Sequence, residues 1–129
     1  MTWDDGYDRV WTDDVEVGTT QIRYGLTTEG GVPVKFLVQL EYRIPVASTD
    51  KWNPGGWHAV ARFDHDATGP TYRNVDRVGL HMDVLKPDGT QLPKRLDFPP
   101  VPITQAMRYA DDYLRHYHDF LIGRFIQWL

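Results

Sequence analysis

Two segments in the middle of the chain alternate apolar and polar residues, which is the pattern of β-strands with one buried face. They are W-H-A-V-A-R-F-D, residues 57–64, and V-G-L-H-M-D-V-L, residues 78–85. Alternation sends successive side chains to opposite faces of a strand. The apolar residues of the two strands are therefore predicted to share one face: Trp57, Ala59, Ala61, Phe63, Val78, Leu80, Met82 and Val84. If the two strands pair, their polar residues gather on the other face.

The same alternation predicts a hairpin earlier in the chain. Apolar residues alternate with polar ones in two runs, first Ile22, Tyr24 and Leu26, then Val34, Phe36, Val38, Leu40 and Tyr42. Glu29-Gly30-Gly31 supplies the turn between them. Segments 47–56 and 64–77 are predicted loops, and 87–90, Pro-Asp-Gly-Thr, is a strong turn signal. Residues 91–96 are predicted to form a short edge segment, because the proline within them cannot donate to a ladder.

Helical spacing marks both ends of the chain. Thr2 followed by Asp5 fits a capping-box-like start, and aromatic residues recur at helical spacing after it, so residues 1–14 are predicted to form an N-terminal helical arm. At the other end, Thr104 is the predicted N-cap of a helix over 104–128. An apolar stripe with a period near 3.6 supports that helix: Ala106, Ala110, Tyr113, Leu114, Tyr117, Leu121, Phe125 and Trp128.

These elements assemble into one α+β domain over residues 1–129, a four- to five-stranded, mainly antiparallel sheet with the long C-terminal helix packed on one face. The 129 residues suffice for one core but not for two domains. A hydrophobic share of 41% and a charged share of 25% are typical of folded globular chains. The residues predicted to share the core are Ile22, Tyr24, Phe36, Val38, Trp57, Phe63, Leu80, Met82, Leu114 and Leu121.

Composition and charge exclude several classes of function. The chain has no cysteine, which excludes disulfides, thiolate metal sites and cysteine nucleophiles. It shows neither a signal-peptide pattern nor an apolar run near the ~20 residues that span a bilayer, so we expect a cytoplasmic protein without membrane association. The net charge of -4 does not predict strong non-specific nucleic-acid binding. A local basic patch could still come from six residues: Arg62, Arg73, Arg77, Lys86, Lys94 and Arg95.

The polar face of residues 57–64 and 78–85 is the predicted functional site. It collects an arginine, two histidines and two carboxylates: Arg62, His58, His81, Asp64 and Asp83. Histidine can move a proton near pH 7 and arginine can neutralise charge on a phosphorane-like transition state, as acid–base cleavage of a phosphodiester requires. The hypothesis assigns catalytic roles to Arg62, Asp64, His81 and Asp83, with a carboxylate orienting His81. The alternative is an ordinary solvated sheet face, which the polar side of 34–42 also provides.

A metal-dependent alternative would use four oxygen and nitrogen ligands: Asp64, Asp66, His81 and Asp83. It ranks second because the last carboxylate is followed by Val-Leu-Lys86 and not by the x-Lys of a common nuclease site. The C-terminal helix offers another set, Asp112, His116 and Asp119. There, however, Arg115 pairs at i, i+4 spacing with Asp111 and Asp119, the pattern of a solvated helix face. The sequence therefore predicts no metal and no cofactor.

The succession V-A-R-F-D with its leading tryptophan, followed by H-x-D-V-L-x-P-D-G, resembles the TumE-like toxins of prokaryotic toxin–antitoxin modules. In that family an aromatic-flanked Arg-[Tyr/Phe]-Asp strand precedes a histidine-containing strand on a small α+β domain. The resemblance covers residues 57–89, about a quarter of the chain, and matches Arg62, Asp64 and His81 to the family's polar strand positions. The family's histidine-rich segment between the strands is missing, and only His65 remains there. The resemblance implies an RNA-targeting toxin neutralised by a cognate antitoxin protein.

Two functions stay open on the sequence alone. The first is a small toxin of a toxin–antitoxin module, acting on RNA as a metal-independent endoribonuclease. The second is a non-enzymatic protein-interaction module that binds a partner through aromatic residues and an acidic N-terminal arm. The chain carries no Gly-rich phosphate loop, no nucleophile elbow and no nucleotide-binding fingerprint. An adjacent antitoxin-like reading frame would favour the first function.

Overall fold

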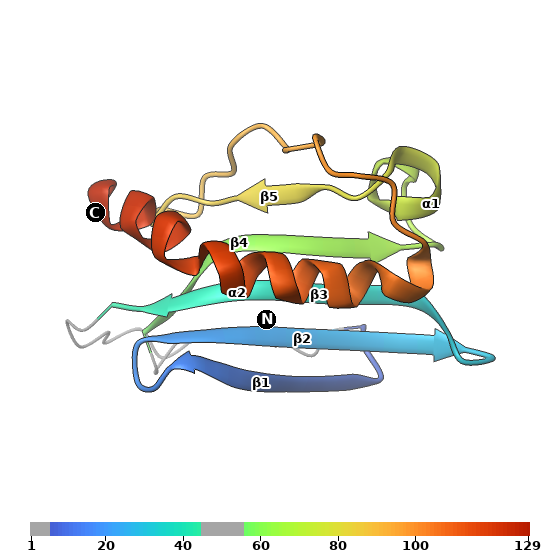
Figure 1. Ribbon diagram of the computed structural model, residues 1–129, viewed down its shortest axis with the longest axis horizontal. Helices are drawn as coiled ribbons and strands as arrows, with labels where there is room; N and C mark the ends of the chain where they lie inside the picture. Colours follow the sequence, from blue (N-terminus) through green and yellow to red (C-terminus); the bar gives the residue numbers. More distant parts are fainter. Residues whose placement is uncertain (1–5, 45–55) are drawn as a thin grey trace.

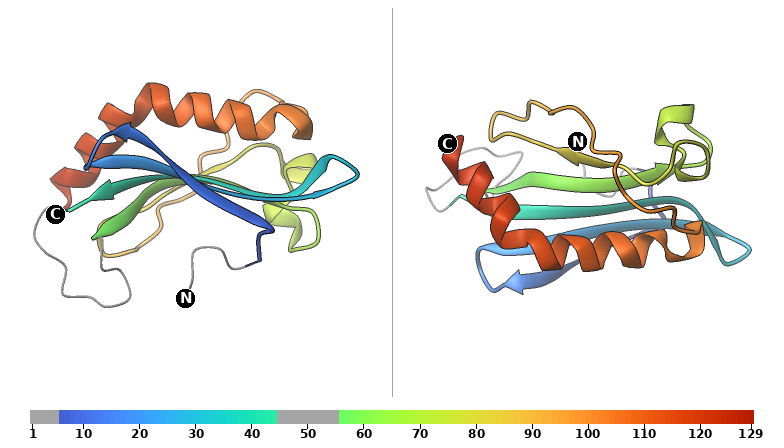
Figure 2. Two further views of the ribbon diagram at one scale, coloured as in Figure 1. Left: turned by 90° about the horizontal axis from the view of Figure 1, so that it is seen from below. Right: turned by 45° about the horizontal axis from the view of Figure 1, so that its top comes forward.

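The protein has two layers, a five-stranded sheet and a long helix, in a computed structural model that describes residues 6–44 and 56–129, with only the backbone of Tyr72 (Figure 1). The strands are β1 (Arg9–Glu16), β2 (Thr20–Glu29), β3 (Val32–Arg43), β4 (Trp57–Asp66) and β5 (Met82–Val84). Each strand pairs antiparallel with its predecessor, so the order is β1-β2-β3-β4-β5. Helix α2 (Ile103–Gln127) crosses one face of the sheet (Figure 2). The predicted α+β architecture is confirmed.

Strands β2 and β3 form the predicted hairpin and set which side chains face α2. Ile22 lies opposite Leu40, and Tyr24 lies opposite Val38. Cross-strand partners point to the same face, and all four side chains are buried in the core. The turn passes through Gly30-Gly31, whose φ angles of 57° and 79° are positive. Glycine adopts that conformation at little cost, so this dipeptide allows the tight reversal.

A bulge in β4 changes the side-chain alternation that the sequence predicts. Leu40 of β3 lies opposite Ala61, but the next residue, Glu41, lies opposite Ala59. Val60 is therefore the extra residue on β4, and its side chain is buried. An extra residue shifts the phase of a strand by one position. The residues after the bulge keep the predicted faces, and the residues before it exchange them.

The prediction is consequently wrong for the start of β4. Ala59 lies opposite a residue of the face away from α2, and Trp57 is two residues before it, so neither side chain points into the core under α2. His58 lies opposite Tyr42, whose ring packs edge-on against Phe125 of α2 at a centroid distance of 6.3 Å. His58 therefore belongs to the α2 side and not to the polar face. The other residues of the predicted core list are buried in one cluster. Val78, predicted to share their face, is 41% exposed, because the second predicted strand spans only Met82–Val84.

Helix α2 closes the core beneath it, as the apolar stripe predicts. Its buried residues are Ala106, Ala110, Leu114, Leu121, Ile122 and Phe125. The helix begins at Ile103 with Pro102 as its N-cap, so the predicted cap at Thr104 lies inside the first turn. A polar contact also ties helix to sheet, because the Tyr24 hydroxyl donates to Asp111 at 2.5 Å. None of the described helices is long and apolar enough to cross a bilayer.

Residues 9–16 form the edge strand β1, so the predicted helical arm over 1–14 is wrong for this part. The backbone of β1 pairs with β2, and the ring of Trp11 stacks on Tyr24 at a centroid distance of 5.0 Å. The position of Trp11 is therefore explained by stacking between two strands and not by helical spacing. The predicted capping box at Thr2 and Asp5, and all but one residue of the predicted loop 47–56, lie outside the described residues.

The connection from β4 to β5 is more ordered than the predicted loop. It contains a 3-10 turn, η1 (Thr71–Arg73), and one turn of helix, α1 (Val75–Val78), which starts where the Asn74 side chain accepts from the Asp76 amide at 3.0 Å. After β5, the predicted edge segment 91–96 does bind the sheet. Met82 and Arg95 exchange both backbone hydrogen bonds at 3.0 Å. This segment protects the outer edge of β5.

Candidate functional site

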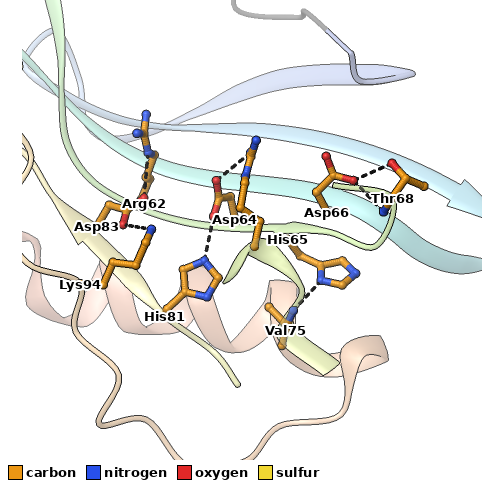
Figure 3. A network of polar contacts seen from close by, with 10 residues as sticks. Arg62, Asp64, His65, Asp66, Thr68, Val75, His81, Asp83 and Lys94 are labelled. Atoms are coloured by element: carbon orange, nitrogen blue, oxygen red, sulfur yellow. Dashed lines mark hydrogen bonds and ion pairs between the residues drawn. The ribbon is translucent and has the colours of Figure 1, made fainter. Parts of the chain in front are cut away.

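The face of the sheet away from α2 carries a group of charged side chains that we call the charged cluster (Figure 3). Its members are Arg62, Asp64, Arg73, His81, Asp83 and Lys94. Strand β4 supplies two of them, and the rest come from η1, from β5 with the residue before it, and from the edge segment. The structure thus brings together the four residues predicted from the sequence. It also adds two cations that the sequence did not place in the site.

Asp83 holds the first half of the charged cluster. Arg62 lies opposite it in the β4–β5 pairing, and its Nε donates to Asp83 Oδ2 at 3.3 Å. Lys94 Nζ donates to the other oxygen at 2.6 Å. The carboxylate is buried, and two cationic donors offset the cost of removing it from water. Arg62 and Lys94 themselves stay 31% and 30% exposed, so part of each cation faces solvent.

Asp64 holds the second half, two residues along β4 and on the same face. It accepts a hydrogen bond from His81 Nε2 at 3.0 Å and one from Arg73 Nη2 at 2.9 Å. Burial by itself raises the pKa of Asp64, but the His81 hydrogen bond and the nearby cations hold that pKa below its usual range. Asp64 is therefore ionised at neutral pH.

His81 supports Asp64 from the interior of the protein. Its side chain is 0% exposed, and its second ring nitrogen, Nδ1, lies 3.3 Å from the Gly79 carbonyl oxygen. Both ring nitrogens therefore lie next to oxygen atoms of the protein. With no exposed surface in this structure, the His81 ring is placed to position Asp64. Direct proton transfer from His81 to a substrate stays a prediction.

The four ligands of the metal-dependent alternative do not converge. Asp66 closes the turn after β4, where it accepts from the Thr68 amide at 3.0 Å and from its hydroxyl at 2.8 Å. Asp64 and Asp83 each bind two other side chains. Among the described residues, no three of these four side chains offer ligand atoms within 4.8 Å of one another. The arrangement favours the metal-independent hypothesis over this alternative.

Tyr7 lies beside the charged cluster, on the same face of the sheet. Its ring covers Gly25, where an added Cβ would come within 2.7 Å of the ring, and Lys35 Nζ lies 4.8 Å from the ring centroid. Burial, followed by the charge of Asp64, raises the pKa of the Tyr7 hydroxyl. The hydroxyl therefore stays protonated at neutral pH. It can donate one hydrogen bond or accept a hydrogen bond. Because the sequence placed Tyr7 on a helix, it gave no reason to expect it here.

A buried carboxylate, Glu41, lies on the same face of the sheet next to β2. Glu41 is fully buried and accepts from Gln21 at 2.7 Å, from Gln39 at 2.8 Å and from Arg23 at 3.0 Å. Three donors hold its charge inside the fold. This group stabilises the sheet beside the charged cluster.

Comparison with known proteins gives the chain a family. A family model described as "Domain of unknown function (DUF7718)" matches residues 1–129, the whole length. The protein belongs to the DUF7718 family. No curated protein and no solved structure matches it. Nothing in these comparisons concerns the TumE-like toxins, so that resemblance stays a prediction. The feature of this DUF7718 chain that points to a function is the charged cluster.

Proposed function

We propose that the charged cluster binds the phosphate backbone of RNA and cleaves it, as the active site of a metal-independent endoribonuclease of the toxin–antitoxin type. The observation that carries the proposal is the arrangement of three part-exposed cations, Arg62, Arg73 and Lys94, over two buried carboxylates. Buried partners fix the cations in place, while their free N–H groups can donate to a phosphate. Such preorganised donors stabilise charge that develops during phosphoryl transfer.

The proposed chemistry starts at Asp64. Its carboxylate takes the proton of a ribose 2′-hydroxyl, the 2′-oxygen attacks the neighbouring phosphorus, the bond to the 5′-oxygen breaks, and the leaving 5′-oxygen takes a proton from water. The product ends in a 2′,3′-cyclic phosphate. Arg62 and Arg73 neutralise the charge on the non-bridging phosphoryl oxygens in the transition state. His81 holds Asp64 in place throughout, and a cytoplasmic location would give the enzyme access to its RNA.

The test compares RNA cleavage by matched variants with end-group analysis of the products. Asp64→Asn and Arg73→Gln are expected to lower the cleavage rate by a factor of ~100 or more. Arg77→Gln is the control, because Arg77 is exposed on the neighbouring turn α1. We expect cyclic phosphate ends and no loss of activity in EDTA. Equal activity in wild type and Asp64→Asn, or products with 3′-hydroxyl ends, would refute the mechanism.

A separate surface favours the protein-interaction function. Tyr113, Tyr117 and Phe120 of α2 line a pocket of about 350 Å³ together with Arg95 and Leu121. Phe120 is 60% exposed, and exposed aromatic rings beside an arginine are typical of protein-binding surfaces. We propose it as the surface through which a non-enzymatic interaction module would bind its partner protein. Phe120→Asp should abolish co-purification with the product of an adjacent reading frame, whereas Arg108→Asp, elsewhere on α2, should not.

A further inference from the structure

We propose that Glu16, His118 and Asp119 form a binding site for a divalent transition-metal ion, for which Zn²⁺ is the best match. Glu16 is the last residue of β1, and the other two residues lie on α2. Their ligand atoms lie within 4.8 Å of one another. The site is on the α2 side of the sheet, so it is independent of the charged cluster and of the function proposed for it.

His118 is oriented as a metal ligand. Its Nδ1 donates to the Arg115 carbonyl oxygen at 2.7 Å, which fixes the ring and leaves Nε2 to face the two carboxylates. Metal-binding histidines almost always hold their second nitrogen in this way, because the hydrogen bond sets the tautomer and the direction of the lone pair. The ring is also mostly buried, while the carboxylates are open to solvent. The binding atom Nε2 therefore has a fixed position.

The separations fit a tetrahedral ion. Nε2 lies 3.2 Å from Asp119 Oδ1 and 3.5 Å from Glu16 Oε1. With ligand bonds of about 2.0–2.1 Å, the edge of a coordination tetrahedron is about 3.3–3.4 Å. Both distances from the imidazole lie within about 0.2 Å of that edge. The exposed carboxylates can rotate to complete the third edge, and one imidazole with two carboxylates suits Zn²⁺ better than Mg²⁺ or Ca²⁺.

Other contacts hold the two halves of the site together. Arg115 of α2 donates to Asp13 of β1 at 2.6 Å, which joins the two elements one turn away from His118. The β1–β2 pairing shifts register between Asp14 and Glu16, and the Thr19 amide donates to the Glu16 carbonyl at 3.1 Å. Glu16 is thus held beside α2 by interactions that do not involve the side chains of the three ligands. Thr19, Thr20 and Tyr42 line the adjoining pocket of about 340 Å³, which leaves room for water as a fourth ligand.

A proton is the competing occupant of this site. A protonated His118 between two carboxylates would form a simple surface ion-pair network, which in general contributes little to stability. Metal and proton compete for the same nitrogen, so the two interpretations differ in one measurable property. Only the metal-site interpretation predicts tight, stoichiometric binding of Zn²⁺ that depends on His118.

Isothermal titration calorimetry of the full chain with ZnCl₂ at pH 7.5 tests the proposal. Wild type should bind one ion, and His118→Gln should weaken binding at least tenfold. His116→Gln is the matched control, because His116 is exposed two residues away on the same helix, and it should leave binding unchanged. MgCl₂ should give no comparable binding. Thermal melting of each variant establishes that it is folded.

Three outcomes overturn the proposal: no stoichiometric Zn²⁺ binding by wild type, equal binding by His118→Gln, or equal loss in both histidine variants. If His118→Gln fails to fold, Glu16→Gln decides, since this carboxylate is largely exposed and its replacement should preserve the fold. Unchanged Zn²⁺ affinity in Glu16→Gln would then be the contrary result. None of these readouts depends on ribonuclease activity, so failure of the proposed function leaves this inference standing.

Discussion

Burial separates the roles of residues that look alike in the sequence. His81 and Asp64 were predicted as one catalytic pair, and they do form a hydrogen bond of 3.0 Å. Asp64 borders the exposed cations, whereas His81 is completely enclosed. The choice between a group that meets substrate and a group that supports it depends on contacts from distant segments. Alternation along a strand shows the face of a residue but not its depth.

His81 is therefore expected to matter for stability as well as for activity. His81→Ala removes a donor from the buried Asp64 carboxylate and leaves space around it. Taking a hydrogen-bond partner away from a buried acceptor costs roughly 1–3 kcal/mol. Urea denaturation followed by tryptophan fluorescence would measure this change in the free energy of unfolding. A variant as stable as wild type would show that His81 is not held as described.

His65 should make stability depend on pH below neutrality. The ring is buried, and its Nδ1 accepts a hydrogen bond from the Val75 amide at 2.9 Å. Burial lowers the pKa of His65 below its ordinary value of 6.5, although the carboxylates of Asp76, Asp66 and Asp64 act in the opposite direction. As the pH falls through 6.5, His65 takes up a proton in the unfolded chain but not yet in the folded chain. Stability is then progressively lost until the pH reaches the lower folded pKa.

The measurement is the free energy of unfolding at several pH values between 7.5 and about 5. His65→Gln should flatten the curve, since glutamine can still accept from the Val75 amide but does not titrate. His118 changes the free energy of unfolding in the opposite direction as the pH falls, because its hydrogen bond to the Arg115 carbonyl raises its pKa. The comparison is therefore made between variant and wild type. An identical slope in both proteins would contradict the assignment.

Some residues of the charged cluster and of the proposed zinc site could not be predicted from the sequence. Arg73 and Lys94 contact Asp64 and Asp83 from segments that carry no strand or helix period. They stood out only as basic residues. The pairing of Glu16 with His118 spans 102 positions and depends on β1 being a strand. No local pattern encodes such a contact.

At the scale of elements, long periodic segments were predicted well and short or exposed ones poorly. The β2–β3 hairpin and α2 each bury one face, so their periods are clear. Edge strand β1 is exposed along most of its length, and its pattern lacks the alternation that burial imposes. The bulge at Val60 had one signal, three consecutive apolar residues at 59–61. The only sequence feature that indicates turn α1 is its capping residue, Asn74.

Helix α2 contains a glycine that is expected to weaken it. Gly123 lies inside the helix, and an added Cβ would meet no atom within 4 Å. Alanine loses less backbone entropy in a helix, so Gly123→Ala should raise the free energy of unfolding by about 1 kcal/mol. Chemical denaturation of the two proteins would show this as a higher midpoint. A lower midpoint would mean that the helix needs the glycine for a contact or a bend.

At the scale of the whole molecule, β1 completes the sheet. It covers the edge of β2, stacks Trp11 on Tyr24 and connects to α2 through Asp13 and Arg115. Deleting residues 1–18 would uncover a long strand edge, and exposed edges promote association between chains. We expect the truncated protein to melt at a lower temperature and to aggregate in size-exclusion chromatography.

The competing prediction concerns charge. Residues 1–20 carry six acidic residues and one basic residue, so their removal would leave a nearly neutral chain that binds polyanions better. RNA binding by the truncated and full-length proteins at two salt concentrations distinguishes the two effects. A stable, monomeric truncation with unchanged RNA binding would contradict both.

The order of the strands also has a consequence for synthesis on the ribosome. Every strand of this sheet pairs with the one made just before it, so β1 to β5 can assemble in the order in which they emerge. Contacts between sequence neighbours close short loops and form early. Helix α2 is made after all five strands, and until it leaves the exit tunnel the apolar face of the sheet lacks this cover. A nascent chain that stalls before Ile103 would present this face to chaperones, and rapid translation of residues 103–127 would shorten that exposure.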